Sequence, residues 1–151
     1  MTPLFYLGYL CSTAGNFFQR RNIRMSDAQV SLQDLKRKMA EFVRERDWEQ
    51  FHTPKNISMS IAIEAAELME HFQWLTVEQS QQLDAKALAA IGEELADIVI
   101  YSLSMANFLQ LDLAETVLAK MEKNIRKYPA DKVQGKSHKY TYYQNQECSE
   151  S

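Results

Sequence analysis

An apolar helical stripe between residues 57 and 75 constrains this chain most, because it runs through a glutamate. At about 100° per residue, Ile57, Ile61 and Leu68 share one helix face. Glu64 lies on the same face, three residues after Ile61 and four before Leu68, so helical packing turns its carboxylate toward the core. Glu67 lies one turn further on, beside Glu64. Two buried carboxylates without a partner would neutralise or destabilise the fold, so the pair predicts a compensating cation.

Length and charge limit the classes of protein to which the chain can belong. Its 151 residues, 46% hydrophobic and 25% charged, fit one soluble domain with a sizeable core. A net charge of −3 argues against binding nucleic acid by bulk electrostatics. The charge is uneven, with −7 from Glu64 to Asp97 and +5 from Lys120 to Lys139. A negative centre followed by a positive tail suits a polyanion bridged by a metal ion.

The ends of the chain carry the compartment signals. Cys11 and Cys148 lie outside every periodic segment, so they predict neither a disulfide framework nor a cysteine metal site, and we expect a cytoplasmic protein. No apolar run approaches the ~20 residues of a membrane span, so no membrane partner is expected. The short apolar run from Leu4 to Cys11 resembles the core of a signal peptide, but no positive charge precedes it.

The periodicity predicts an all-α fold, a helical bundle of about four main helices. We expect an N-terminal extension or flexible arm over residues 1–25, the helical domain over 26–143 and a polar C-terminal tail over 144–151. Capping residues predict three helix starts, at Thr53, Asp84 and Asp112. The main helices are expected over residues 31–48, 54–75, 85–109 and 113–127. Thr76 to Gln79 has the spacing of a capping box, and residues 131–143 are expected to be irregular.

A second acidic pair, Glu94 and Asp97, lies on the third of these helices with the same spacing as Glu64 and Glu67. Antiparallel packing would bring the two pairs face to face. Four hard oxygen ligands fit Mg²⁺, whose remaining positions are usually completed by water and substrate phosphates. Calcium is possible but lacks its loop motif, and a di-iron site would require Glu-x-x-His pairs that do not occur.

Surface helices are rich in acids, so a single E-x-x-E motif is weak evidence of a metal site. What distinguishes the four carboxylates is their placement against the apolar stripe. We assign Glu41, Glu70 and Glu93 to solvated faces, and we read His71 as an ordinary helix histidine. Two further questions stay open. Trp48 and Trp74 either belong to the core or stack on a base, and the lysines at 120, 123 and 127 form either a solvated face or a phosphate clamp.

Four blocks occur in this order: ERDWEQFHTPKN, EAAELMEHFQW, EELADIVIYSL and KMEKNIRKYPADKVQGKSHKYT. Together they resemble the MazG-like nucleotide pyrophosphohydrolases, and especially their dCTP pyrophosphatase branch, over residues 32–142. The resemblance implies a helical bundle assembled as an oligomer, commonly a tetramer built as a dimer of dimers. It also implies Mg²⁺-dependent hydrolysis of nucleoside triphosphates to monophosphate and pyrophosphate, with Mn²⁺ as a possible substitute.

The resemblance also implies roles for single residues. The implied metal ligands are Glu64, Glu67, Glu94 and Asp97. The chemistry also requires a glutamate to orient or deprotonate the attacking water, and Glu67 is our candidate, although the sequence does not assign which carboxylate is ligand and which is base. The residues implied near base and sugar are Trp48, Trp74, Tyr101 and Asn124, and those implied at the phosphates are Lys123, Arg126, Lys136 and Lys139. His52 falls within a matching block and is a further candidate for substrate binding, without an assigned role. Met39 stands where animal dCTP pyrophosphatases have a histidine that contacts the base, which leaves the base preference open.

We therefore expect a dNTP pyrophosphohydrolase that favours dCTP or modified dCTP and cleans the nucleotide pool. One alternative is a pyrophosphohydrolase with another or a broader base preference. The other is a non-catalytic helical oligomer that binds nucleotide or a protein partner.

Overall fold

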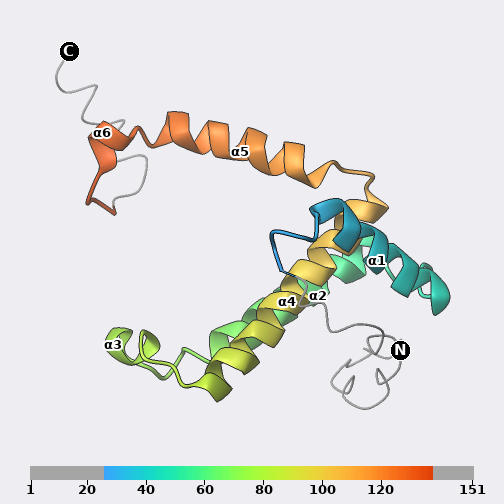
Figure 1. The fold of residues 1–151 in the computed structure, drawn as a ribbon, viewed down its shortest axis with the longest axis horizontal. Coiled ribbons are helices and arrows are strands. Elements are labelled where there is room, and N and C mark those ends of the chain that lie inside the picture. The colour runs from blue at the N-terminus through green and yellow to red at the C-terminus, as the bar shows by residue number, and fades with distance from the viewer. Residues whose placement is uncertain (1–25, 138–151) are drawn as a thin grey trace. The chain divides into compact units, whose positions relative to one another are not determined.

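The protein's computed structural model describes residues 26–137, and within this range every regular element is a helix (Figure 1). The elements are α1 (Leu32–Glu45), α2 (Pro54–Glu70), α3 (Val77–Ser80), α4 (Ala85–Phe108), α5 (Leu113–Lys127) and α6 (Ala130–Val133). The predicted all-α fold with four main helices is thus confirmed, the long helices being α1, α2, α4 and α5. The chain divides into two units, residues 1–31 and 32–151. The predicted N-terminal arm and C-terminal tail lie outside the described residues.

Three of the helices begin at the predicted capping residues. The side chains of Thr53, Asp84 and Asp112 each accept a hydrogen bond from the backbone N–H three residues further on, at 3.4, 2.7 and 2.9 Å respectively. Pro54 occupies the first position of α2, where its missing N–H costs nothing. The predicted capping box between Thr76 and Gln79 is also formed, at the start of α3. These starts are set by local sequence, which is why they could be predicted.

The predicted ends of the first two helices were less accurate than their starts. Two helices, α1 and α4, are each followed by a non-glycine residue with positive φ. Asp47 (φ 52°) follows α1 and Gln110 (φ 54°) follows α4. At the first of these ends the Trp48 N–H donates to the Val43 carbonyl at 3.0 Å, which is the six-to-one bond of a Schellman motif. The expectation that the first helix reaches Trp48 was wrong, since α1 stops at Glu45. The second helix was also predicted too long, because α2 ends at Glu70 rather than near residue 75.

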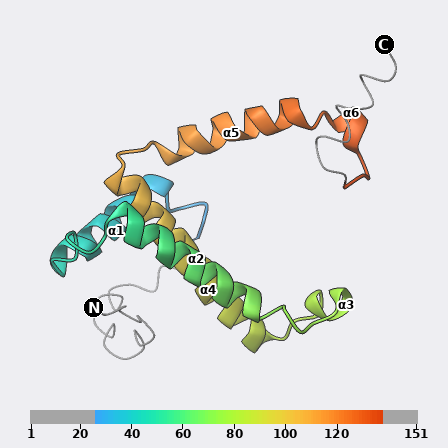
Figure 2. The same ribbon diagram turned by 180° about the vertical axis from the view of Figure 1, so that it is seen from behind.

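The helices α2 and α4 run side by side along most of α2, as Figures 1 and 2 show from opposite sides. The most buried side chain on α2 is Ile57, which is 2% exposed, and α4 contributes Leu103 and Ala106. α1 packs on the later part of α4 and adds Met39 and Val43 to this core. The core is therefore concentrated where α1, the start of α2 and the end of α4 meet.

Two hydrogen bonds fasten α1 to the end of α4. Lys36 Nζ donates to the carbonyl of Leu111 at 2.7 Å, and Asn107 Nδ2 donates to the carbonyl of Lys36 at 2.8 Å. Both bonds join residues more than 70 positions apart in the sequence. They fix the register between the two helices at the end of α4 that holds the core.

Much apolar surface is uncovered in the single chain. On α4, Leu88 is 56% exposed and Leu95 is also exposed. The amphipathic helix α5 has no buried residue, and its Leu118 is 62% exposed. α5 does not pack along α2 or α4.

The segment after α5 departs from the sequence prediction in one place. Residues 131–143 were expected to be irregular, but the single helical turn of α6 extends to Val133. Proline at 129 directly precedes α6, and its fixed φ suits the start of a helical turn. Among the described residues, no helix is long and apolar enough to cross a membrane.

Candidate active site

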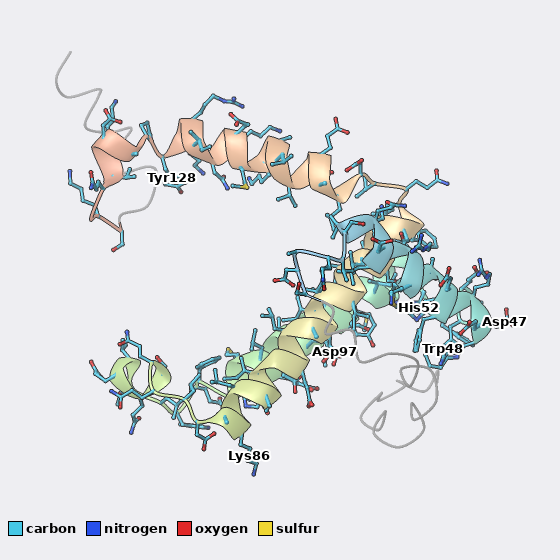
Figure 3. The ribbon with its side chains drawn as sticks, viewed as in Figure 1. Asp47, Trp48, His52, Lys86, Asp97 and Tyr128 are labelled. Atoms are coloured by element: carbon cyan, nitrogen blue, oxygen red, sulfur yellow. The ribbon has the colours of Figure 1, made fainter. Side chains whose placement is uncertain are left out.

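Polar residues follow the line along which α2 and α4 meet, and we call this line the polar seam. Helical spacing of three and four residues places four of them on one face of each helix. The members on α2 and its C-cap are Ser60, Glu64, Glu67 and His71, and the α4 members are Glu94, Asp97, Tyr101 and Ser104. His71, directly after the end of α2, lies 4.0 Å from Glu94 in the first half of α4. This contact shows that the two helices run in opposite directions. Figure 3 shows Asp97 on α4 where that helix runs beside α2.

Three carboxylates of the seam form a compact group, the acidic cluster of Glu64, Glu94 and Asp97. Each offers one oxygen, and these oxygens all lie within 4.8 Å of one another. All three side chains are partly buried. Oxygens on opposite sides of one Mg²⁺ ion lie about 4.2 Å apart, since each Mg–O bond is about 2.1 Å. Small side-chain rotations would therefore let the acidic cluster hold one divalent cation.

The pKa values of all three carboxyl groups of the cluster are raised, first by burial and then by neighbouring carboxylates. Burial, followed by repulsion from Asp97, Glu67 and Glu94, raises the pKa of Glu64 to about 7. The pKa of Glu94 is raised by burial and by neighbouring carboxylates, and His71 only partly opposes this shift. Burial and then the Glu93 charge raise the pKa of Asp97. Bringing a cation among these groups would favour their ionised forms.

Glu67 was predicted to be both a ligand and the catalytic base. It is not one of the three residues of the acidic cluster. Its charge nevertheless raises the pKa of both Glu64 and Glu94, so its carboxylate lies near theirs. Its two roles stay predictions.

Tyr101 lies next along the seam, one turn after Asp97. Burial is the main cause that raises its pKa, with the Glu64 charge second. The Ser60 side chain of the facing helix partly opposes the rise in the pKa of Tyr101. Tyr101 therefore remains a neutral hydroxyl beside the cluster, able to donate or accept a hydrogen bond.

The far end of the seam is aromatic. The rings of Trp48 and His52 stack with centroids 6.3 Å apart and planes 18° apart. The Phe42 ring meets the Trp48 ring edge-on, with ring centroids 5.8 Å apart. The His52 ring also lines a cavity of about 320 Å³ together with Met39 and Ser104. The structure therefore brings Met39, which was expected near the base, into one cavity with His52.

The remaining predicted substrate residues do not reach the acidic cluster within the single chain. Trp74, after the end of α2, is 86% exposed. The basic and amide candidates of α5 are exposed, and Arg126 pairs locally with Glu122 at 3.9 Å. Lys136, after α6, donates to the Lys132 carbonyl at 3.4 Å. The exposed α5 candidates are Lys123, Asn124 and Arg126, whereas Lys139 lies outside the described residues.

Sequence reasoning missed three members of the seam. Ser60 and Ser104 were not singled out, and His71 was read as ordinary although it lies 4.0 Å from Glu94. His71 also lines a second cavity, of about 440 Å³, between the end of α2 and the start of α4. The available signal was spacing, since Ser60 lies four residues before Glu64 and Ser104 lies seven after Asp97.

Residues 59–142 match the model of the MazG-like family. The chain belongs to this family. It is 43% identical over 115 residues to human dCTP pyrophosphatase 1, an alignment that covers 75% of this chain and 68% of the human protein. It is 42% identical over 116 residues to the bovine dCTP pyrophosphatase 1, covering 76% and 69% of the two chains.

A solved structure extends the likeness from sequence to fold. The crystal structure of a pyrophosphatase from Archaeoglobus fulgidus superposes with a TM-score of 0.62 at 39% sequence identity. The match covers 65% of this chain and 92% of the archaeal one. The predicted resemblance to the MazG-like family and its dCTP pyrophosphatase branch is therefore confirmed.

Proposed function

We propose that this protein is a Mg²⁺-dependent dNTP pyrophosphohydrolase that favours dCTP or modified dCTP. The observation that carries the proposal is the acidic cluster, which holds three carboxylates within 4.8 Å of one another in a chain 43% identical to human dCTP pyrophosphatase 1. Such a cluster lowers the stability of the free protein and gains from a cation, which suits a site that binds a metal with its substrate. The proposed role is cleaning of the nucleotide pool in the cytoplasm.

The proposed reaction is a hydrolysis at the α-phosphorus. The oxygen of water forms a bond to the α-phosphorus, the bond from that phosphorus to the α,β-bridging oxygen breaks, and pyrophosphate leaves with the electron pair. Glu67, beside the cluster, is the residue we propose to orient the water and accept its proton. Mg²⁺ held by Glu64, Glu94 and Asp97 would offset the negative charge of the carboxylates and the triphosphate.

The rest of the seam suits a nucleoside. With the triphosphate at the acidic cluster, Tyr101 is the next polar group and is proposed to meet the sugar. Trp48 and His52 present aromatic surface at the far end, where a base can stack. The nucleotide would then lie along α4, with its charge at one end of the seam and its base at the other.

The predicted substrate residues that do not reach the acidic cluster are proposed to act from another copy of the chain in a homotetramer. Exposed apolar side chains on α4 and α5, such as Leu95 and Leu118, supply surface for such an assembly. Association would let side chains from one copy approach the phosphates and base bound to another. The residues proposed to do so are Trp74, Lys123, Asn124, Arg126, Lys136 and Lys139.

A different or broader base preference is the second candidate, and Met39 is the observation that favours it. Met39 lines the cavity that His52 and Ser104 also line, and it stands where the resemblance implies a histidine. A methionine offers apolar contact without a hydrogen-bond donor, so it discriminates less between bases.

Pyrophosphate release across a panel of dNTPs, including 5-methyl-dCTP, with Mg²⁺ or Mn²⁺ tests the proposal. We expect the highest kcat/KM for dCTP or its modified form. Fastest release from a purine nucleotide would overturn the dCTP preference and support the broader enzyme. No release from any triphosphate would overturn the enzymatic proposal in favour of a nucleotide-binding module.

A further inference from the structure

Ser104 is a buried polar residue whose hydroxyl has a distant partner. The residue is 5% exposed, and its Oγ lies 3.0 Å from Nδ1 of His52. The neighbouring Ser102 behaves differently, because its hydroxyl donates back along the helix to the Ile98 carbonyl at 2.7 Å. A buried hydroxyl hydrogen needs an acceptor, and the acceptor that the geometry gives Ser104 is the His52 ring nitrogen.

The His52 ring is suited to accept that hydrogen. Burial lowers the pKa of His52, so the neutral imidazole with one unprotonated nitrogen prevails at pH 7. If Nδ1 accepts from Ser104, the ring hydrogen must lie on Nε2. The bond thus selects one tautomer and one ring orientation.

That orientation matters because His52 supports the Trp48 ring. The two planes lie 18° apart, and Phe42 braces Trp48 from another direction at 75°. Ser104, His52 and Trp48 therefore form a chain of contacts from the helix α4 to the half-buried Trp48 ring. The imidazole is thus a direct link between Ser104 and the Trp48 ring.

The position of Ser104 along α4 links this chain of contacts to the acidic cluster. Ser104 follows Asp97 by seven residues, which is two turns and roughly 10 Å along the axis. A nucleotide whose α-phosphate lies at the cluster would extend its base toward the cavity lined by Ser104 and His52.

We propose that Ser104 is a positioning residue for base recognition, which acts through His52 to hold the Trp48 ring in its stacking orientation. The inference rests on the proposed function, because it assigns the base end of the same site. Ser104 itself need not contact the nucleotide. Its hydrogen bond restricts rotation of the imidazole, so less side-chain conformational entropy is lost when the base binds.

Steady-state kinetics of Ser104→Ala, with Ser102→Ala as the matched control on the same helix, test the proposal. Ser104→Ala should raise KM for dCTP about tenfold with kcat within about twofold, because it loosens binding but leaves the reacting groups in place. Ser102→Ala should keep both constants. In a His52→Phe background, Ser104→Ala should add less than about a twofold change, since its route to Trp48 is already lost. Unchanged KM in Ser104→Ala, or full additivity with His52→Phe, would overturn the inference.

Nitrogen-15 NMR of His52 in the wild-type protein gives a readout that does not depend on activity or on the folding of a variant. We expect the Nε2–H tautomer, and a mixture of tautomers in Ser104→Ala. The Nδ1–H tautomer in the wild type would overturn the inference. Absence of pyrophosphate release with the Nε2–H tautomer present would count against the proposed function instead, so the two failures are distinguishable.

Discussion

The two ends of the polar seam are built on opposite principles. At the acidic cluster, Glu64, Glu94 and Asp97 repel one another and have raised pKa values. At the aromatic end, Ser104 and His52 satisfy each other with a neutral hydrogen bond of 3.0 Å. A polar group satisfied within the protein serves the fold, whereas a group of like charges left uncompensated is suited to a ligand from outside. The difference separates the end expected to bind a metal from the end expected to orient a base.

The largest effect is expected for Glu64→Gln, which keeps the side-chain volume but removes one charge from the acidic cluster. Without metal the variant should be at least as stable as the wild type, because repulsion within the cluster is relieved. Turnover should fall about 10²-fold or more, because a metal ligand is lost. Thermal melts with and without Mg²⁺, read beside pyrophosphate release, measure both effects.

Glu70→Gln is the matched control for this substitution, since it removes the same charge from an exposed position on the same helix. It should leave turnover and the Mg²⁺-induced shift in melting temperature unchanged. A Glu64→Gln protein that melts lower without metal yet turns over normally would mean that Glu64 forms a structural ion pair, and the contrast between the two ends would be lost.

Ile57→Ala tests whether the apolar core can be weakened without affecting metal binding at the acidic cluster. Ile57 is 2% exposed, so its truncation should lower the free energy of unfolding by about 2–5 kcal/mol. The increase in stability on adding Mg²⁺ should persist, because Ile57 is not part of the acidic cluster. Denaturant unfolding with and without Mg²⁺ measures both quantities, and loss of the Mg²⁺ effect would show that the core and the cluster are coupled.

The acidic cluster should make the stability of the protein depend on pH. The pKa of Glu64 rises from 4.5 unfolded to about 7 folded, so the folded protein binds more protons between these values. Its contribution to stability is present in full below pH 4.5 and is lost as pH rises through 7. Melting temperature without metal should therefore drop from pH 5 to pH 7.5, and Glu64→Gln should flatten the drop. A wild-type melting temperature that rises over this range would contradict the repulsion inferred at the cluster.

The smallest effect, and the only gain in stability outside both ends, is expected at Gln110. Its φ of 54° is strained for a residue with a side chain, so Gln110→Gly should raise the free energy of unfolding by about 1 kcal/mol. Gln110→Ala is the control and should bring no gain, since alanine has the same φ penalty. Equal stability of the two variants would mean that the left-handed position carries no strain.

What could be predicted from the sequence was local or periodic. The caps at Thr53, Asp84 and Asp112 each bond to a backbone N–H three residues away, so a short window contains the whole interaction. Glu64 and Asp97 were found because helical periodicity places them against apolar neighbours. The all-α fold followed from the same periodicity.

The rest depended on contacts that no short window contains. The bond between His52 and Ser104 joins residues 52 positions apart, and a serine in a helix gives no sign of its partner. The end of α1 was missed because Asp47 adopts a positive φ that glycine would have signalled. Which of Glu64, Glu67, Glu94 and Asp97 come closest depends on the register between α2 and α4, and the sequence does not specify that register.

Mn²⁺ binding, followed by the loss of the electron paramagnetic resonance signal of the free ion, tests the metal-site assignment most directly. Wild type, Asp97→Asn and the exposed control Glu70→Gln would be titrated in parallel. If the acidic cluster holds the cation, Asp97→Asn should weaken binding about tenfold or more while Glu70→Gln matches the wild type. Equal affinities for all three proteins would contradict the assignment of the acidic cluster as the metal site.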